Sequence, residues 1–458
     1  MKYNYSDEPE AAGLRFDNMK KQDTDSTQPT EAVNFTFFVA YMAALSAFGS
    51  FVNDMFVPAM PEMRDSFGCS VSTIQLGLTM GMVGLAIGQL VLGPVSDKYG
   101  RKPTLMWSLA VFMIAGIVSV FSPDVCFFLV CRFVQGLGAS GGYFLARTIP
   151  TDLYSGRMLA KTMALIGAIN GIAPATAPVL GGFVAHAWGW QAVFVFLTVI
   201  ALAVFAFAPR MKESLPYERR NHGTLLGAFR NYGTMLRNRR FMVHTLLKGT
   251  ALGILFAYVS SATFIIQRHF GYSEIHFGLI VGVNALFVVL GSMLALKFKM
   301  LKTAGFAGAI ILIVSVTALG VVLFFFNDSF ILYEICLVPM LFGLGMLFSM
   351  SNTLAMNEGR SDAGVASAIL GITGYVFGAI VPPLTGLNGV LQASAIVIFS
   401  LGVLVVIFAV MSWKIPADLD SGTTGGSPAP ESRQQQVRKK NSKFAEFLQN
   451  PVKCNQNQ

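Results

Sequence analysis

Long apolar stretches separated by short polar connections run along most of the chain. A window of about 20 apolar residues is long enough to cross the hydrocarbon layer of a membrane as a helix. We predict twelve such helices, with the approximate bounds 35–57, 73–93, 103–122, 125–148, 160–186, 190–209, 242–266, 275–296, 304–326, 331–355, 363–386 and 389–413. The pattern therefore predicts an all-α membrane protein with twelve transmembrane helices.

The predicted helices divide into two sets of six. The first set occupies residues 35–209, the second occupies 242–413, and a polar linker at 210–241 joins them. Two such halves are typical of transporters with a central site between internal repeats. Residues 1–34 and 414–458 are predicted to be tails, and we expect no cleavable signal peptide because 1–34 has no basic stretch followed by a short apolar one.

Composition and charge agree with a membrane protein. Hydrophobic residues make up 54% of the chain, charged residues make up 12%, and the net charge is +9. We number the connections in chain order, so that the first joins predicted helices one and two. Lys and Arg concentrate in the even-numbered connections, whereas the odd-numbered ones contain only Arg64 and Arg268. Because basic loops resist translocation, both termini are predicted to be cytoplasmic. Topology thus accounts for the positive charge, which argues against nucleic-acid binding, and the basic C-terminal tail either lies in solvent or contacts anionic lipid.

The sequence has no pattern typical of an enzyme. It contains neither a phosphate-binding loop of the Walker type nor His, Cys and carboxylate residues at metal-ligand spacing, and its five cysteines are scattered. We therefore predict no enzymatic activity, no cofactor and no metal site. An ion gradient remains as the energy source for transport, and we expect a monomer.

A charged turn, "GPVSDKYGRKP", lies between the second and third predicted helices. Gly93 and Gly100 permit a tight reversal of the chain. Asp97 is an acid among bases, and its charge is stabilised by a basic partner or by the N-terminal end of a helix. The bases beside it are Lys98, Arg101 and Lys102.

This turn resembles the signature of the major facilitator superfamily: Gly, three residues, Asp, a basic residue, any residue, Gly and two basic residues. The resemblance implies a conformational latch that stabilises the outward-open state by contacting helix eleven and an acid at the end of helix four. Asp152 is similar to that acid. The corresponding turn between helices eight and nine, "ALKFKMLKTAG", lacks the Asp and the second Gly.

Three further stretches extend the resemblance, which covers roughly residues 35–413. "CRFVQGLGAS" carries Arg132 and Gln135 at the positions of the family motif in helix four, and "NDMFVPAMP" resembles the "DMYLPALP" of the Bcr/CflA subfamily of drug:proton antiporters. "APATAPVLGG" is similar to the antiporter signature of helix five, with Ala177 in place of a Gly. The matching residues there are Pro178, Gly181 and Gly182.

Asp54 and Arg132 are the candidate proton-coupling residues. An acid near the outer end of helix one is unfavourable unless it faces a cavity, a partner or the water boundary, where it would only cap the helix. Arg132 lies at a similar predicted depth, so the two side chains could pair. The alternative for Arg132 is a structural arginine that binds backbone carbonyls.

Other polar residues interrupt the apolar helices. Hydrogen bonds between helices explain such residues as often as substrate contact does. Arg147 is expected to reach the membrane surface or Asp152, Lys248 to anchor helix seven at the cytoplasmic face, and Glu334 to lie at the outer interface. The candidates for a substrate cavity are Asn53, Gln135, Tyr143, Asn170, Tyr258 and Tyr375.

The sequence predicts a proton-coupled exporter in a bacterial inner membrane. Walls rich in Phe and Met favour a lipophilic, drug-like small molecule as the substrate, moved by alternating access between the two halves. Two alternatives remain: a dedicated exporter of a natural metabolite such as a siderophore, and a transport-inactive sensor or scaffold whose tail binds a partner. A nutrient importer fits the antiporter signature of helix five less well.

Overall fold

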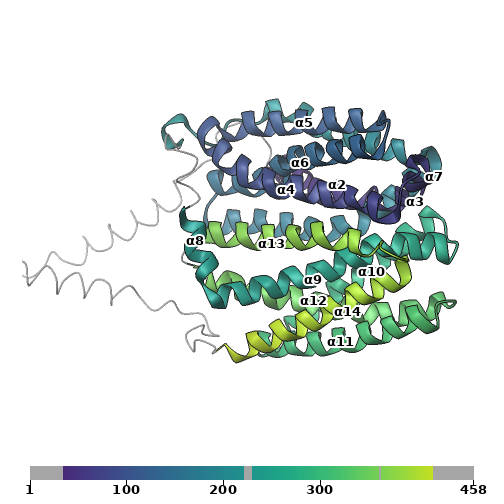
Figure 1. The fold of residues 1–458 in the computed structure, drawn as a ribbon. Helices are drawn as coiled ribbons and strands as arrows, with labels where there is room; N and C mark the ends of the chain where they lie inside the picture. Colours follow the sequence, from purple (N-terminus) through teal and green to yellow (C-terminus); the bar gives the residue numbers. More distant parts are fainter. Residues whose placement is uncertain (1–34, 221–229, 361–362, 416–458) are drawn as a thin grey trace, which may run out of the picture. The chain divides into compact units, whose positions relative to one another are not determined.

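The structure, a computed structural model, describes residues 35–220, 230–360 and 363–415, so nearly all of the two predicted tails lies outside it. Within these residues the chain is helical, without β-strands (Figure 1). The first half contains α2 (Phe35–Asp54), η1 (Val57–Ala59), α3 (Met60–Phe67), α4 (Val71–Tyr99), α5 (Arg101–Val120), α6 (Val125–Leu153) and α7 (Gly156–Phe207). The remaining elements are η2 (Ala208–Arg210), η3 (Tyr217–Arg219), α8 (Arg230–Arg237), α9 (Arg239–Phe264), η5 (Ile265–His269), α10 (Glu274–Ala295), α11 (Leu301–Phe325), α12 (Phe330–Glu358), α13 (Ala363–Leu384) and α14 (Val390–Lys414).

The long element α7 consists of two helices that meet at Gly189. The φ angle of Gly189 is 79°, a backbone conformation that glycine adopts with little strain. In the described part of the chain, 11 segments are long and apolar enough to cross a membrane, and the segment Lys161–Arg210 contains two of the predicted helices. The prediction of twelve membrane-spanning helices is therefore confirmed.

The helices form two groups of six, the purple-to-blue group and the teal-to-yellow group of Figure 1. In the first group α6 packs on α4 and α5, and α2 packs on α7; in the second, α12 packs on α10 and α11, and α14 packs on α9. The groups meet mainly along two helix pairs, α4 with α13 and α7 with α10. All four helices contribute residues to the wall of the space between the halves.

Glycines allow the helices to approach closely at corresponding places in the two halves. A Cβ added at Gly84 of α4 would lie 2.2 Å from the carbonyl oxygen of Phe133 in α6. A Cβ added at Gly345 of α12 would lie 2.0 Å from the carbonyl oxygen of Val288 in α10. Close backbone packing at small residues is a main source of helix association in membranes, and both halves use it at matching crossings.

Large apolar side chains cover the outer faces of both groups. Trp107, Ile114 and Val130 are exposed in the first half, and Leu286 and Val314 are exposed in the second. Such a surface matches hydrocarbon rather than water as the surrounding solvent. We call the end of the bundle with the α4–α5 turn the motif end, and the opposite end, near α3, the far end (Figure 1).

Candidate transport cavity

A cavity of about 1440 Å³ lies between the two halves. Its wall comes from α2, α4, α6 and α7 on one side and from α9, α10, α12 and α13 on the other. Asp54, the last residue of α2, lines it at the end remote from the motif. Asp97, Thr151 and Met356 line it close to the motif-end termini of their helices. The cavity therefore extends from Asp54 to the motif end.

Hydrogen bonds between the halves close the far end. The side-chain amide of Gln75 in α4 donates to the Thr385 hydroxyl at 3.0 Å and to the Ser260 carbonyl at 3.1 Å. The Thr263 hydroxyl donates to the Val57 carbonyl at 2.9 Å, and the Gln267 amide donates to the Pro58 carbonyl at 2.8 Å. Arg268 forms an ion pair with Asp65. Among the described residues, the halves are thus joined by hydrogen bonds at the far end, whereas the cavity separates them towards the motif end.

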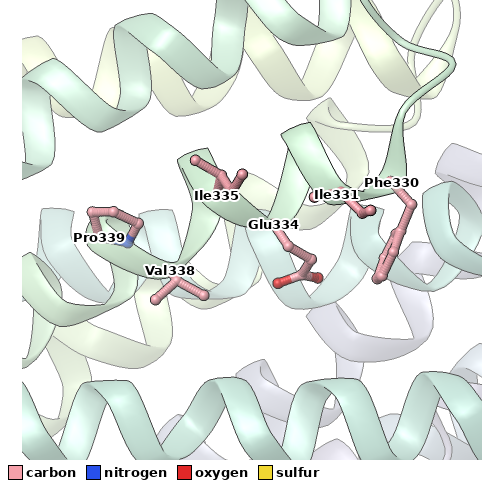
Figure 2. Close-up of a pocket in the computed structure, with 6 residues that line it drawn as sticks. All are labelled: Phe330, Ile331, Glu334, Ile335, Val338 and Pro339. Atoms are coloured by element: carbon pink, nitrogen blue, oxygen red, sulfur yellow. The ribbon is translucent and has the colours of Figure 1, made fainter.

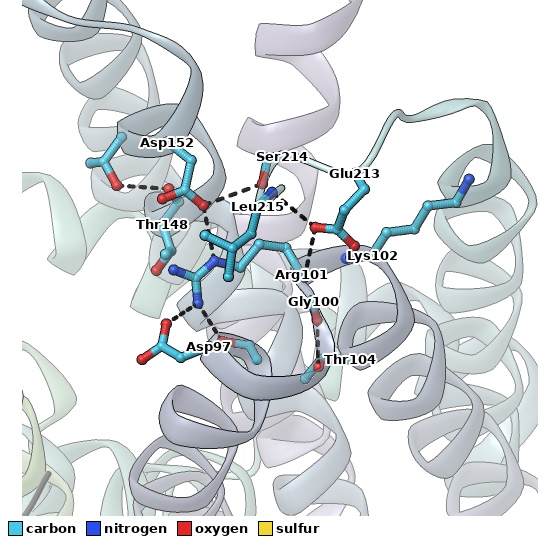
Figure 3. A network of polar contacts seen from close by, with 12 residues as sticks. Asp97, Gly100, Arg101, Lys102, Thr104, Thr148, Asp152, Glu213, Ser214 and Leu215 are labelled. Carbon is cyan, nitrogen blue, oxygen red and sulfur yellow. Dashed lines mark hydrogen bonds and ion pairs between the residues drawn. The ribbon is translucent and has the colours of Figure 1, made fainter. Parts of the chain in front are cut away.

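Arg101 is the centre of a polar network at the motif end (Figure 3). Its guanidinium donates to Asp97 Oδ1 at 2.5 Å and to Asp152 Oδ2 at 2.9 Å, so that it links α4, α5 and α6. Glu213, beyond α7, accepts from the backbone N–H of Arg101 at 2.8 Å and from that of Lys102 at 3.2 Å. The carboxylate thereby satisfies N–H groups at the start of α5 that have no partner within the helix.

The chain reverses more sharply than we expected. Gly93 and Pro94 lie inside α4, and Gly100 alone makes the turn, with a φ of 105° and a would-be Cβ 2.6 Å from Glu213 Oε2. Lys98 lies over the Tyr99 ring, and Lys102 Nζ donates to the Pro209 carbonyl at 2.7 Å.

The network stays within the first half and the residues that follow it. Among the described residues, no hydrogen bond or ion pair joins Asp97, Arg101 or Asp152 to α13, the eleventh membrane-spanning helix. Asp152 is engaged by Arg101, and it also accepts from the Ser214 hydroxyl at 3.2 Å. The expected alternative pair of Asp152 with Arg147 is therefore not formed.

Arg132 binds carbonyl oxygens instead of pairing with Asp54. It is fully buried and donates to the carbonyls of Val52 at 3.0 Å and Gly77 at 3.3 Å, and its Nη1 donates to Gln135 Oε1 at 2.5 Å. The Val52 carbonyl is available because it belongs to the last turn of α2. The guanidinium also lies over the Phe56 ring, 4.2 Å from its centroid. Arg132 thus ties α2, α4 and α6 together.

Gln135 does not lie where the sequence predicted. We expected this side chain in the cavity wall, but it is completely buried within the first half, where Arg132 holds its oxygen. Asn53, in contrast, does line the cavity, and its Oδ1 is buried without a hydrogen-bond partner in the described residues. Asp54 lines the cavity beside it, and no ion pair with Asp54 forms within the described part of the chain.

The other predicted cavity residues lie in the wall. Tyr143, Asn170, Tyr258 and Tyr375 all line the cavity. Asn170 also accepts a hydrogen bond from the Ser46 hydroxyl at 2.8 Å. The Tyr258 hydroxyl accepts one from the Asn284 amide at 3.1 Å.

Two basic residues also line the cavity, contrary to our expectation. Arg147 Nη2 donates to the Tyr143 hydroxyl at 2.7 Å, and Lys248 Nζ donates to Asn352 Oδ1 at 2.8 Å. Sequence reasoning assigned both cations to the membrane surface because each lies in the part of its helix nearest the motif end. Only the packing of the two halves reveals that they face one space.

The residues of the antiporter signature lie at contacts of α7 with other helices. A Cβ on Gly182 would lie 2.4 Å from the Glu274 carbonyl oxygen in α10, and one on Gly181 would lie 1.8 Å from the Met55 carbonyl oxygen. The Pro178 carbonyl oxygen approaches Gly278 of α10, where a Cβ would lie only 2.6 Å away. This stretch therefore permits close packing of the first half on the second.

Glu334 of α12 lies between the central cavity and the outer surface. Its carboxylate accepts from the Asn284 amide at 3.1 Å, and Asn284 lines the central cavity. Glu334 also lines an outer groove of about 420 Å³, whose other walls are the apolar side chains in Figure 2. It lies four residues from the far-end terminus of α12, and its position at the outer interface stays a prediction. Among the described residues, no His, Cys, Asp and Glu gather in a way that could bind a metal ion.

Comparison with known proteins identifies the class. The model of the Major Facilitator Superfamily matches residues 40–383. The chain is 33% identical to the uncharacterized MFS-type transporter YdgK of Bacillus subtilis, over 78% of this chain and 90% of the relative. It is 26% identical to multidrug resistance protein D of Escherichia coli, over 72% and 83%, and 25% identical to a bicyclomycin resistance protein homolog of Haemophilus influenzae, over 81% and 94%.

Solved structures share the fold. The inward-open xylose transporter XylE from E. coli superposes with a TM-score of 0.66 at 15% identity, covering 85% of this chain and 98% of XylE. A bacterial homolog of the human lysosomal transporter Spinster has a TM-score of 0.64 at 15% identity, covering 83% and 96%. The chain belongs to the major facilitator superfamily. It is a multi-pass membrane transporter and not an enzyme, and it resembles the drug transporters of that family.

Proposed function

We propose that the protein is a proton-coupled exporter of lipophilic, drug-like small molecules. The observation that carries this proposal is a carboxylate in the substrate cavity: Asp54 lines the space between the halves and has no ion-pair partner among the described residues. A charged carboxylate without a partner is unfavourable in a membrane-embedded cavity. Binding a proton or a cationic group neutralises the charge and stabilises the site.

Alternating access supplies the cycle. When the cavity is open at the motif end, Asp54 is ionised and the protein binds its substrate. Closure at the motif end and opening at the far end would expose Asp54 to the other side, where protonation would favour release. Arg132 acts here as a positioning residue, because it binds the Val52 carbonyl two residues before Asp54.

The direction of transport depends on topology. The positive-inside rule assigns the motif end, with Lys98, Arg101 and Lys102, to the cytoplasm of a bacterium, and hence both tails as well. In this orientation the open cavity faces the cytoplasm and admits an export substrate. The names of multidrug resistance protein D and of the bicyclomycin resistance protein homolog favour a drug over a dedicated metabolite such as a siderophore.

Proton coupling is tested in purified protein reconstituted into vesicles that contain a pH-sensitive dye. With an imposed pH gradient, the parent should exchange protons for compounds from a panel of antibiotics and lipophilic dyes. Asp54→Asn keeps the size of the side chain but cannot ionise, so we expect substrate-dependent proton movement to fall at least about 100-fold.

The matched control is Asp328→Asn, which removes an exposed acid outside the cavity, in the turn between α11 and α12. It should retain transport within about threefold, since an exposed surface charge contributes little. Full proton exchange in Asp54→Asn would overturn the proposed role of Asp54. If the parent moves no panel compound but does move components of an extract of secreted metabolites, the dedicated exporter is favoured. If it moves neither, the scaffold is favoured.

A further inference from the structure

Arg147 of α6 and Lys248 of α9 present positive charge to the cavity from opposite halves. Both side chains line the cavity. Two cations that face one cavity within a membrane protein are unfavourable without negative charge nearby. This arrangement requires a reason beyond packing.

The bonding of the two cations leaves their charge uncompensated. Arg147 donates to the neutral Tyr143 hydroxyl and lies over the Tyr143 ring, 4.4 Å from its centroid. Lys248 donates to the neutral amide oxygen of Asn352. Across the described residues, neither cation forms an ion pair, and Asp97, the acid of the cavity wall at the motif end, is bound to Arg101.

Asp54 forms no ion pair with Arg147 or Lys248 among the described residues. Tyr143 packs at the level of Gly49, where a Cβ would lie 2.8 Å from the Tyr143 ring. Asp54 lies five residues from Gly49 towards the far end, and Arg147 lies four residues from Tyr143 towards the motif end. At about 1.5 Å per residue, the backbones of Asp54 and Arg147 are therefore separated by ~13 Å along the bundle. The Arg147 guanidinium is held by Tyr143 instead.

We propose that Arg147 and Lys248 form an anion-binding subsite, and that the transported molecules include amphiphiles with a carboxylate, sulfonate or phosphate group. The anionic group of the substrate would lie between Arg147 and Lys248. It would supply the negative charge that these two side chains lack among the described residues. The apolar body would lie along Phe256, Leu252 and Val288 of the cavity wall, between this subsite and Asp54. This inference rests on the proposed transport function and narrows its substrate class.

A matched pair of fluorescent probes tests the subsite. 8-Anilinonaphthalene-1-sulfonate and N-phenyl-1-naphthylamine share an anilinonaphthalene body and differ in the sulfonate. Binding is measured at equilibrium on the purified full chain in an uncharged detergent, with empty micelles subtracted. The parent should bind the sulfonate probe more tightly than the neutral one, and added NaCl should weaken only the sulfonate probe.

Variants assign the preference to the two residues. In Lys248→Met and in Arg147→Met, affinity for the sulfonate should fall about tenfold, because each variant removes one charge-assisted hydrogen bond. Affinity for the neutral probe should stay within about twofold, which also reports that the cavity has folded. Lys248→Arg should retain sulfonate binding. Lys299→Met, in the α10–α11 turn, is the control and should match the parent.

Three results would overturn the subsite: equal affinity of the parent for the two probes, no effect of salt on sulfonate binding, or variants that weaken both probes alike. The salt measurement needs no variant, so it decides the matter even if both Met variants misfold. Because binding is measured without a gradient, it is independent of proton coupling. Coupled transport of neutral compounds alone would contradict the subsite and leave the proposed function intact. Sulfonate binding without coupled transport would contradict the proposed function and leave the subsite intact.

Discussion

The two halves of the protein share their helix packing but not their charges. Gly84 and Gly345 allow equivalent crossings, α4 on α6 and α12 on α10. At the turn that follows α4, Arg101 binds Asp97 and Asp152, whereas the corresponding turn after α10 contains Lys297 and Lys299 and no acid. Packing must be kept in both halves because the fold requires it. The charged network, in contrast, is present at the α4–α5 turn and has no counterpart acid in the α10–α11 turn.

The carboxylates of the two halves differ in the same way. Asp54 of the first half lines the central cavity without an ion-pair partner among the described residues. Glu334 of the second half accepts hydrogen bonds from Asn284 and borders a groove on the outer surface. The first half therefore places in the cavity wall a carboxylate that is unpaired among the described residues, and the second half supplies Lys248 to the opposite wall.

The largest expected effect concerns the feature that the halves share. Gly84→Val and Gly345→Val each place a Cβ against a backbone carbonyl, where no side chain can move aside. Overpacking of this kind typically costs about 1–3 kcal/mol, and separation of two helix backbones should reach the upper end. We expect loss of the monodisperse peak in detergent gel filtration, or a lower melting temperature, for both variants.

The chain offers matched controls for this experiment. Gly167→Val in α7 and Gly320→Val in α11 add the same atoms where a Cβ meets nothing within 4 Å. Both should behave like the parent. If Gly84→Val is damaging and Gly345→Val is harmless, the two crossings are not equivalent. This result would contradict the claim that the two halves share their helix packing.

Sequence alone predicts the fold of this protein well and its cavity less well. Apolar windows located all twelve membrane-spanning helices, because length and hydropathy decide what crosses a membrane. A side chain's direction is harder to predict, since a helix turns by about 100° per residue and the predicted ends shift by several residues. For this reason the sequence did not predict that Gln135 lies inside the first half, or that Arg147 and Lys248 line the cavity. Their surroundings depend on how the two halves meet, which no local pattern records.

A smaller effect is expected at the turn where the halves differ. Asp97 is half-exposed and borders the cavity. We expect it to contact α13 when the halves close at the motif end. Asp97→Asn keeps the size and removes the charge, which should destabilise that closed state by ~1–2 kcal/mol and lower transport about tenfold. Protein levels in the membrane should not change. Lys299→Gln, in the corresponding turn of the second half, should transport like the parent, and unchanged transport by Asp97→Asn would exclude a latch at this position.

The smallest effect distinguishes one proton site from two, one in each half. If Asp54 alone carries protons, one proton enters for each substrate molecule that leaves. Export of a monovalent cation then moves no net charge, so the membrane potential, worth about 2.3 kcal/mol per charge per 100 mV, does not drive it. A pH gradient drives it by about 1.4 kcal/mol per unit. Export of a neutral compound moves one positive charge inward and draws on both terms. Collapsing the potential with a potassium ionophore should therefore slow neutral export a few-fold and leave cation export nearly intact. Glu334→Gln should not alter either response. If potential alone drives cation export without a pH gradient, and Glu334→Gln abolishes this, then the second half contributes a proton site and Asp54 does not carry the coupling alone.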